Sequence, residues 1–172
     1  IAHAQLHQWS QGFGGALGDT GLSLARDNSG NGVVTGSFNT SITLGGHSHT
    51  SSGGTDIFIV KFDAAGNQLW HKVIGGNCLD DGFGICTDSN GGVIVTGRFC
   101  GSQVDFNGNG SDPSDPSSMG DGDAFVVKYD GSGNYLWVWT SELSALGVDY
   151  GRDVCVDAEN NVYVTGCDGV WD

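Results

Sequence analysis

The sequence predicts an all-β fold made of repeated four-stranded antiparallel sheets, and three observations predict it. Three segments of the 172-residue chain align with one another without a gap, which indicates internal repeats. Each apolar run is four to eight residues long, is rich in Val, Ile, Phe and Tyr, and is bounded by Gly, Asn or Asp. No segment has a helical period. We therefore expect short strands joined by tight turns.

Each of the three aligned segments begins with Asp-x-Gly and ends with Val-Thr-Gly. They span residues 19–36, 80–97 and 149–166. The threonines of Val-Thr-Gly recur at spacings of 61 and 69 residues. A second motif occurs twice between them, as DIFIVKFD at 56–63 and DAFVVKYD at 123–130.

The strands are expected in a fixed order within each repeat. The first two strands join through 28–31, 89–92 or 158–161, and the last two join through 63–67 or 130–134. Gly and Asn in these turns supply the positive φ that tight reversals need. The third strand alternates apolar residues onto both of its faces, so each sheet must be covered on both faces.

One more strand is expected before the first repeat, around Gln8–Phe13. Trp9 stands ten residues before Asp19, as Trp70 stands ten residues before Asp80. This segment is therefore expected to be the fourth strand of a preceding sheet.

A row of such sheets stacked face to face is usually arranged radially, as a β-propeller. The expected blades are 17–76 and 77–143, with the last strand of a preceding blade in 1–16 and the first half of a third blade in 144–172. Propellers take about 4 to 8 blades, so about two full blades with partial blades at both ends make an incomplete ring. Natural proteins normally cover the open sheet edges that result.

Two alternatives follow for completing the ring. The chain, which lacks an initiator Met, is expected to be part of a longer polypeptide that supplies further blades. Otherwise other copies of the chain cover its edges, and head-to-tail contacts that do not close make a filament.

The repeat resembles that of a known family, the bacterial β-propeller repeat proteins of the SBBP type. The matching residues are the two eight-residue motifs, GNQLW at 66–70 and GNYLW at 133–137, and the Asp-x-Gly and Val-Thr-Gly motifs. The resemblance covers nearly the whole chain. It implies an extracellular or cell-surface propeller, often within a much longer polypeptide, and it implies no catalytic residues.

The connection between the second and third strands differs most between the copies. It is expected to be a loop at 45–54 in one copy and at 107–122 in the other. Variable loops on a repeated scaffold are where binding function usually lies. His47 and His49 lie in the first loop, but zinc needs three or four ligands, so a surface loop is expected there.

The second of these loops contains a candidate calcium site. Asp105, Asn107 and Asn109 alternate before a glycine, which fits the opening of a calcium loop with oxygen ligands at alternate positions. Pro116 stands where a bidentate Glu belongs, so Asp112 or a later aspartate must supply the missing carboxylate. A solvated acidic loop without a cation is the other interpretation.

Five cysteines include one pair that is expected to be bonded. If the hairpin pairs Asp88 with Val93, Cys100 lies opposite Asp81, and Cys78 is close enough in sequence to reach it. We therefore predict a disulfide between Cys78 and Cys100, which suits a secreted protein. Asn39 and Asn109 begin N-glycosylation sequons.

Residues that recur in every copy are expected to be structural, because an active site is needed once whereas a turn is needed in each blade. This argument makes turn residues of Asp19, Asp80 and Asp149. It assigns Trp9, Trp70 and Trp137 to packing between blades, and leaves the unrepeated Trp139 and Trp171 as candidates for carbohydrate contacts.

Charge and motif content exclude several classes of function. With 20 Asp and Glu against 6 Lys and Arg, the formal net charge is -14, which disfavours nucleic acid and anionic membranes as partners. No apolar run approaches the roughly 18 residues of a membrane span, and no catalytic motif occurs. We expect a non-enzymatic extracellular structural or assembly segment. The alternative is a ligand-binding or carbohydrate-binding module with a calcium-organised loop and a glycan as ligand.

Overall fold

The computed structural model describes residues 8–141 and 147–167 of the chain. Trp171, the expected blade boundary at 143 and 144, and the first seven residues lie outside the described ranges. Within them, ten strands form three antiparallel sheets, and no helix is present. The predicted all-β fold of propeller-type, four-stranded antiparallel sheets is confirmed, and the ring is not closed.

Blade 1 and blade 2 have the same topology, with strand order equal to chain order. Blade 1 consists of β1 (Thr20–Arg26), β2 (Gly32–Leu44), β3 (His47–Phe62) and β4 (Gln68–Ile74). Blade 2 consists of β5 (Asp81–Thr87), β6 (Val93–Phe99), β7 (Asp123–Tyr129) and β8 (Tyr135–Thr140). The third sheet has two described strands, β9 (Tyr150–Val156) and β10 (Val162–Cys167).

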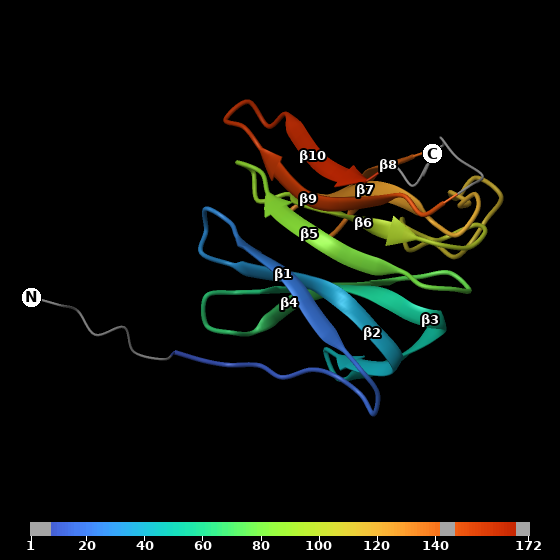
Figure 1. The fold of residues 1–172 in the computed structure, drawn as a ribbon. Coiled ribbons are helices and arrows are strands. Elements are labelled where there is room, and N and C mark those ends of the chain that lie inside the picture. The colour runs from blue at the N-terminus through green and yellow to red at the C-terminus, as the bar shows by residue number, and fades with distance from the viewer. Residues whose placement is uncertain (1–7, 142–146, 168–172) are drawn as a thin grey trace, which may run out of the picture.

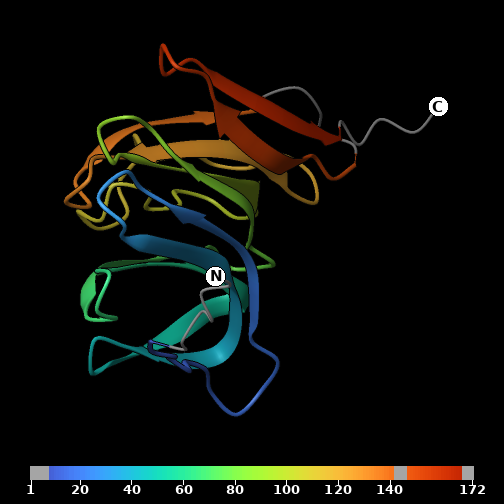
Figure 2. The same ribbon diagram turned by 90° about the vertical axis from the view of Figure 1, so that its left-hand side faces the viewer.

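The three sheets lie one above another, with blade 2 between blade 1 and the β9–β10 pair (Figure 1). The turned view shows the same layering (Figure 2). The first strands of successive sheets lie against each other, since β1 contacts β5 and β5 contacts β9, and β5 also contacts β2 and β3. The described residues supply no fourth strand of a third blade to lie against β8. The β9–β10 pair therefore covers only part of the face that blade 2 turns toward it.

The strand alternation of β3 covers both faces of blade 1, as predicted. Ile57 and Ile59 point toward blade 2 and join a core with Phe125 and Tyr129 of β7. The intervening residues Phe58, Val60 and Phe62 point the other way, into a second core with Phe38 and Ile42 of β2. Each sheet therefore supplies half of two cores, one on each face.

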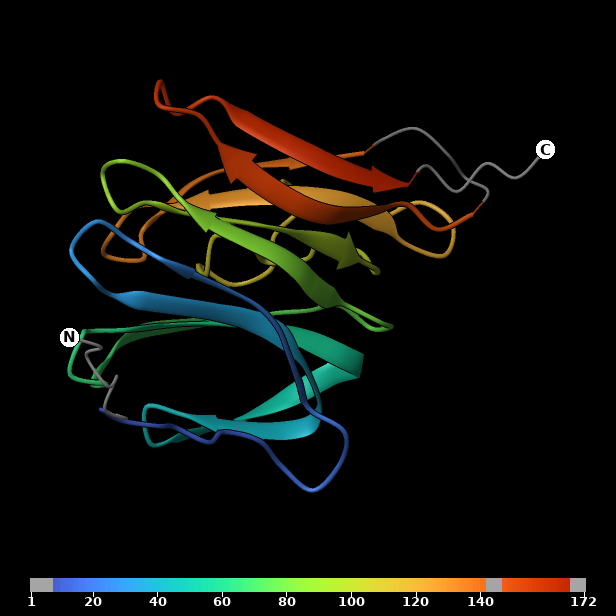
Figure 3. The same ribbon diagram turned by 60° about the vertical axis from the view of Figure 1, so that its left-hand side comes forward.

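The prediction of a loop at 45–54 is wrong, because this segment is mostly strand. β2 and β3 run on past the body of the blade and reverse at Gly45 and Gly46, whose φ angles are 58° and 80°. Ile42 and Leu44 alternate with polar residues and are buried against blade 1, so the hairpin folds beneath its own sheet (Figure 3). Apolar alternation followed by a two-glycine turn is typical of a β-hairpin. The length of the connection led instead to the prediction of a loop.

The prediction of a strand at Gln8–Phe13 is also wrong, because these residues form no strand. A fourth strand needs a third strand to pair with, and the described residues supply none for it. The side chains nevertheless take the predicted positions. The ring of Trp9 lies 5.7 Å from that of Phe62, and the ring of Phe13 lies 5.2 Å from that of Phe58, measured between centroids.

The predicted register of the β5–β6 hairpin is wrong. Val93 pairs with Thr87 rather than Asp88, and a bulge between Gly82 and Gly84 brings Arg98 opposite Asp81. Arg98 then donates to the Asp81 carboxylate at 2.8 and 3.0 Å.

Candidate assembly surface

Three side-chain contacts recur in both complete blades, and each depends on the last two strands of a blade. The first is made by a tryptophan of one blade on the turn of the next. Trp70 Nε1 donates to the carbonyl of Gly131 at 3.1 Å, as Trp9 Nε1 donates to that of Ala64 at 3.1 Å. Gly133 lies flat on the Trp70 ring with φ 86°, and a Cβ there would come within 2.9 Å of the ring. The expected role of these tryptophans in packing between blades is therefore confirmed for Trp70, and Trp9 makes the equivalent contact with blade 1 from a segment that forms no strand.

The second contact explains the threonine of Val-Thr-Gly. Thr35 Oγ1 donates to the carbonyl of Phe58 at 3.0 Å, and Thr96 Oγ1 donates to that of Phe125 at 2.7 Å. Both threonines are completely buried, so these bonds satisfy hydroxyls that have no water to bind. Each bond ties the second strand of a blade to the third.

The third contact is a buried ion pair that sequence reasoning missed. Lys61 Nζ lies 2.9 Å from the carboxylate of Asp27 and donates to the carbonyls of Gly91 and Gly131 in the next blade. Lys128 Nζ lies 2.7 Å from Asp88 in the same way. The signal was in the sequence, because the lysine of both eight-residue motifs and the aspartate before each first turn recur in register.

The lysines determine the ionisation of their partners. Burial of Asp27 opposes its charged form, but hydrogen bonds from Lys61 and Asn31 outweigh this and lower its pKa. Asp88 follows the same pattern with Lys128. The two carboxylates are therefore held charged inside the stack.

The β9–β10 pair and the neighbouring strand β8 carry residues equivalent to these donors and acceptors, but without their partners. Within residues 8–141 and 147–167, the Trp137 indole N–H and the Thr165 hydroxyl have no hydrogen-bond acceptor, and Asp157 has no lysine. Asp157 is the position equivalent to Asp27 and Asp88. In the complete blades the partners of all three side chains come from the third and fourth strands of a blade or the turn between them, and no described strand takes that place beside β10.

The surface around these residues is apolar and open. Trp139 is 55% exposed, Val164 is 40% exposed and Trp137 is 37% exposed. They line two adjoining hollows of about 240 and 300 Å³ between β8 and β10, together with Val126 and Val162. We call this surface, formed by Val126, Trp137, Trp139, Val162, Val164 and the free edge of β10, the β8–β10 face.

The recurring aspartates that precede the first strands close the connections between blades. Asp80 is fully buried and accepts hydrogen bonds from the amides of Gly76 and Cys100 at 2.8 and 2.7 Å. Asp19 binds the amides of Gly15 and Asn39 in the same way. The predicted turn role is confirmed for these two residues. Asp149, equally buried, accepts from Ser141 Oγ at 3.2 Å.

Three of the buried carboxylates, those of Asp56, Asp80 and Asp123, have pKa values that burial raises. Burial raises the pKa of Asp80 to about 7, despite its two amide donors, and the charges of Asp56 and Asp81 add to the shift. Burial likewise raises the pKa of Asp56 to about 6. Neither Asp56 nor Asp80 has a cationic partner in the described part of the chain.

We expect the protein to be more stable at pH 5 than at pH 8. Native Asp56 and Asp80 keep protons that the unfolded chain has already released above about pH 4, so stability falls as pH rises through 6 and 7. Asp80→Asn should flatten this dependence, as measured by urea unfolding at several pH values. Asp121→Asn, which removes one exposed charge, controls for the general fall in net charge. An equal flattening by both variants would contradict the assignment.

The candidate calcium loop is closed by its own hydrogen bonds. The Asp105 carboxylate accepts from the amides of Gly108 and Gly110 at 2.6 and 2.8 Å, and Asn107 donates to Asp115 at 3.1 Å. Asp112 accepts from Ser114 at 2.6 and 2.7 Å, and Asn109 donates its amide to Asn107. No group of three or more His, Cys, Asp or Glu side chains in the described residues is arranged to hold a metal ion. The calcium site stays a prediction.

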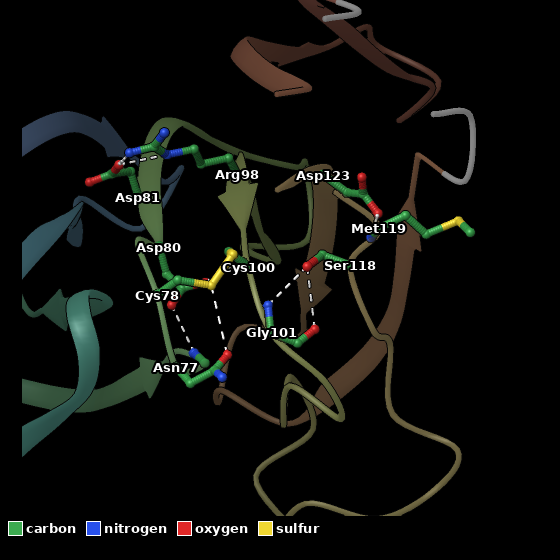
Figure 4. The surroundings of a disulfide bond; sticks show 11 residues. Asn77, Cys78, Asp80, Asp81, Arg98, Cys100, Gly101, Ser118, Met119 and Asp123 are labelled. Carbon is green, nitrogen blue, oxygen red and sulfur yellow. Dashed lines mark hydrogen bonds and ion pairs between the residues drawn. A yellow bond between two sulfur atoms is a disulfide. The ribbon is translucent and has the colours of Figure 1, made fainter. Parts of the chain in front are cut away.

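The predicted disulfide is confirmed, since Cys78 and Cys100 are bonded (Figure 4). The bond joins the segment before β5 to the end of β6, next to the buried Asp80. The predicted sequons are also located. Asn39 is half-buried and its amide donates to Asp19, whereas Asn109 is exposed.

The fold brings together two histidines that lie 22 positions apart in the chain. His49 Nε2 and His71 Nε2 lie 3.0 Å apart, and Gln68 contacts Nδ1 of His71 at 3.0 Å. The pKa of His71 is lowered by burial and by the neighbouring histidines.

The described residues contain no helix long and apolar enough to cross a membrane.

Comparisons with known proteins agree with the repeat architecture. The chain is 30% identical, over 92% of its length, to an uncharacterised WD repeat-containing protein of Acanthamoeba polyphaga mimivirus. It is 30% identical, over 87% of its length, to the regulatory protein FlaEY of Caulobacter vibrioides. The chain spans 13% and 16% of the lengths of these relatives. No protein-family model matches the chain. WD repeats are propeller repeats, so the similarity supports the propeller type without the finer assignment to SBBP repeats.

Proposed function

We propose that this segment is a non-enzymatic structural or assembly module of an extracellular or cell-surface propeller protein. Its role is to stack blades through repeated contacts and to present an apolar face to the next structural unit. The single observation that carries this proposal is the β8–β10 face, where three repeated contacts lack their partners and two tryptophans are exposed. Large exposed apolar patches mark interaction sites in soluble proteins.

Other features support the location and the non-catalytic role. The Cys78–Cys100 disulfide is typical of oxidising compartments outside the cytosol. The buried aspartates that recur at the blade connections bind backbone amides, which is a structural use of their carboxylates. The similarity to much longer proteins agrees with further blades of the same polypeptide as partners.

Light scattering over a concentration series tests the assembly role. We expect the isolated chain to form larger particles as concentration rises, because association buries the exposed apolar side chains of the β8–β10 face. Trp139→Asp should keep the chain monomeric, because it places a charge on this face. Leu69→Asp, which changes a residue 50% exposed on β4, is the matched control and should assemble like the wild type. A wild type that stays monomeric at millimolar concentration would overturn the proposal.

Glycan binding is the second candidate function, and one observation favours it. Trp137 and Trp139 are exposed on the same strand, as a platform for sugar rings requires. The face between them has mostly apolar neighbours and few hydrogen-bonding groups for sugar hydroxyls. Quenching of tryptophan fluorescence by a soluble polysaccharide, lost in Trp139→Ala, would support this candidate over assembly.

A further inference from the structure

We propose that the β8–β10 face binds a two-stranded β-hairpin whose first strand carries a lysine and whose turn has the sequence Asp-x-x-Gly-Asn. The inference rests on the proposed assembly function and names the partner by its chemistry. The chain forms two such hairpins itself, β3–β4 and β7–β8, so their contacts specify what the partner must offer.

The backbone of β10 provides the first requirement, an antiparallel strand. β10 pairs with β9 on one side, and no described strand pairs with the other edge of residues 162–166. In both complete blades the second strand pairs there with the third, as β6 does with β7. The Thr165 hydroxyl stands where Thr35 and Thr96 donate to a carbonyl of that third strand. An incoming strand in the same register supplies this carbonyl.

Asp157 provides the second requirement, a positive charge. Its carboxylate already accepts hydrogen bonds from the Asn161 side chain at 2.7 Å and from the Tyr163 hydroxyl at 2.9 Å. Asp27 and Asp88 make the same asparagine or main-chain contacts in their turns, and each also pairs with a lysine of the third strand. The partner strand therefore needs a lysine at the position of Lys61 and Lys128, one residue before an aromatic residue.

Lys128 provides a second sign that a turn is missing. The Lys61 side chain is 2% exposed because its ammonium also binds two carbonyls of the next blade, Gly91 and Gly131. The Lys128 side chain is 15% exposed, and no carbonyl of the described residues is bound to it. A hairpin turn placed over β8 offers the carbonyl that Lys128 lacks.

Trp137 determines the sequence of that turn. Trp9 and Trp70 each bind the carbonyl of the residue after the first aspartate, and each lies under a glycine with φ 88° or 86°. Those turns read DAAGN and DGSGN. A side chain in place of the glycine meets the indole ring, so Asp-x-x-Gly-Asn is the turn that fits on Trp137.

The hairpin of residues 122–141 of this protein has all of these features and serves as the probe. As a synthetic peptide added to the full chain, it should slow amide exchange in β10 by about tenfold or more. A peptide with Lys128→Met or Gly133→Val should bind at least about tenfold more weakly. The Asp157→Asn chain should no longer distinguish the lysine peptide from the Lys128→Met peptide. A scrambled peptide of the same composition is the control.

A second arrangement removes the entropic cost of binding a free peptide, because isolated hairpins are only marginally stable. The same hairpin is attached after residue 172 through a flexible Gly and Ser linker, and its Gly133→Val version is compared with it. The inference is overturned if the attached hairpin leaves β10 exchange unchanged, or if the lysine and methionine peptides bind the wild-type chain equally. Light scattering of the chain alone reports the assembly role separately, since it contains no added hairpin.

Discussion

Lys61→Ala is expected to lower the free energy of unfolding by roughly 3 to 5 kcal/mol, which is the usual effect of removing one partner from a buried ion pair. The ammonium of Lys61 holds Asp27 charged and bridges to two carbonyls of blade 2, with both side chains almost completely buried. Removing it leaves the buried Asp27 carboxylate without its cation, although donors from Ser29 and Asn31 remain. The Gly91 carbonyl also loses its lysine donor, whereas that of Gly131 keeps the Trp70 indole. Urea unfolding followed by circular dichroism measures the loss.

Lys128→Ala is the matched control, because it breaks the equivalent pair where the next blade is incomplete. Its side chain is 15% exposed, so water reaches the carboxylate of Asp88 when the lysine is lost. We expect a smaller loss of roughly 1.5 to 3 kcal/mol. Equal losses for the two lysines would contradict the argument that the next blade completes the environment of Lys61.

Trp70→Ala is expected to cost about 3 kcal/mol or more, because the substitution leaves a cavity between two blades. The Trp70 ring packs against the core of blade 2 and under Gly133, and its N–H binds the Gly131 carbonyl. Trp137→Ala at the equivalent position should cost less than about 1 kcal/mol, as for an exposed residue. Thermal and urea unfolding of the two variants give the comparison.

The difference between the two tryptophans has its own control. Binding of the hairpin probe should convert Trp137 into a covered residue, so Trp137→Ala should then weaken hairpin binding. A large destabilisation by Trp137→Ala in the dilute chain without a hairpin would mean that residues outside the described ranges already cover it.

Much of the fold could be predicted because its turns and packing residues repeat. The spacing of Trp9, Trp70 and Trp137 predicted contacts between blades, and the Gly and Asn punctuation located the tight turns. The prediction of a loop at 45–54 was wrong because a long connection between two strands was assumed to be irregular. Just before this segment, the alternation of Ile42 and Leu44 with polar residues already indicated a strand.

The predicted register of β5 and β6 was wrong by one residue at the turn, where Val93 pairs with Thr87, and the bulge between Gly82 and Gly84 shifts the pairing by one more residue. The disulfide prediction survived this error because a Cα separation of 5.5 Å tolerates a neighbouring register. The ion pairs of the candidate site were missed for a different reason. Lys61 and Asp27 are 34 positions apart, and only the β2–β3 pairing brings them together.

Amino-acid composition could not predict which aspartates are buried. An excess of acidic residues indicates a solvated surface, yet Asp56 and Asp80 lie inside the stack with raised pKa values. Asp80 binds amides at the connection between the blades, and Asp56 binds the amide of Ser52 within β3, so the burial of both depends on the folded chain. Repetition in register was the sequence signal for a structural role, and it held for Asp19 and Asp80.

Amide hydrogen exchange of the dilute, monomeric chain tests the central claim most directly, namely that repeated contacts close blades 1 and 2 but leave the β8–β10 face uncovered. We expect slow exchange in β2, β3, β6 and β7, where neighbouring strands pair on both sides, and fast exchange along the outer edge of β10. Adding the 122–141 hairpin should then slow β10 selectively. Exchange in β10 as slow as in β6, in the dilute chain alone, would contradict it.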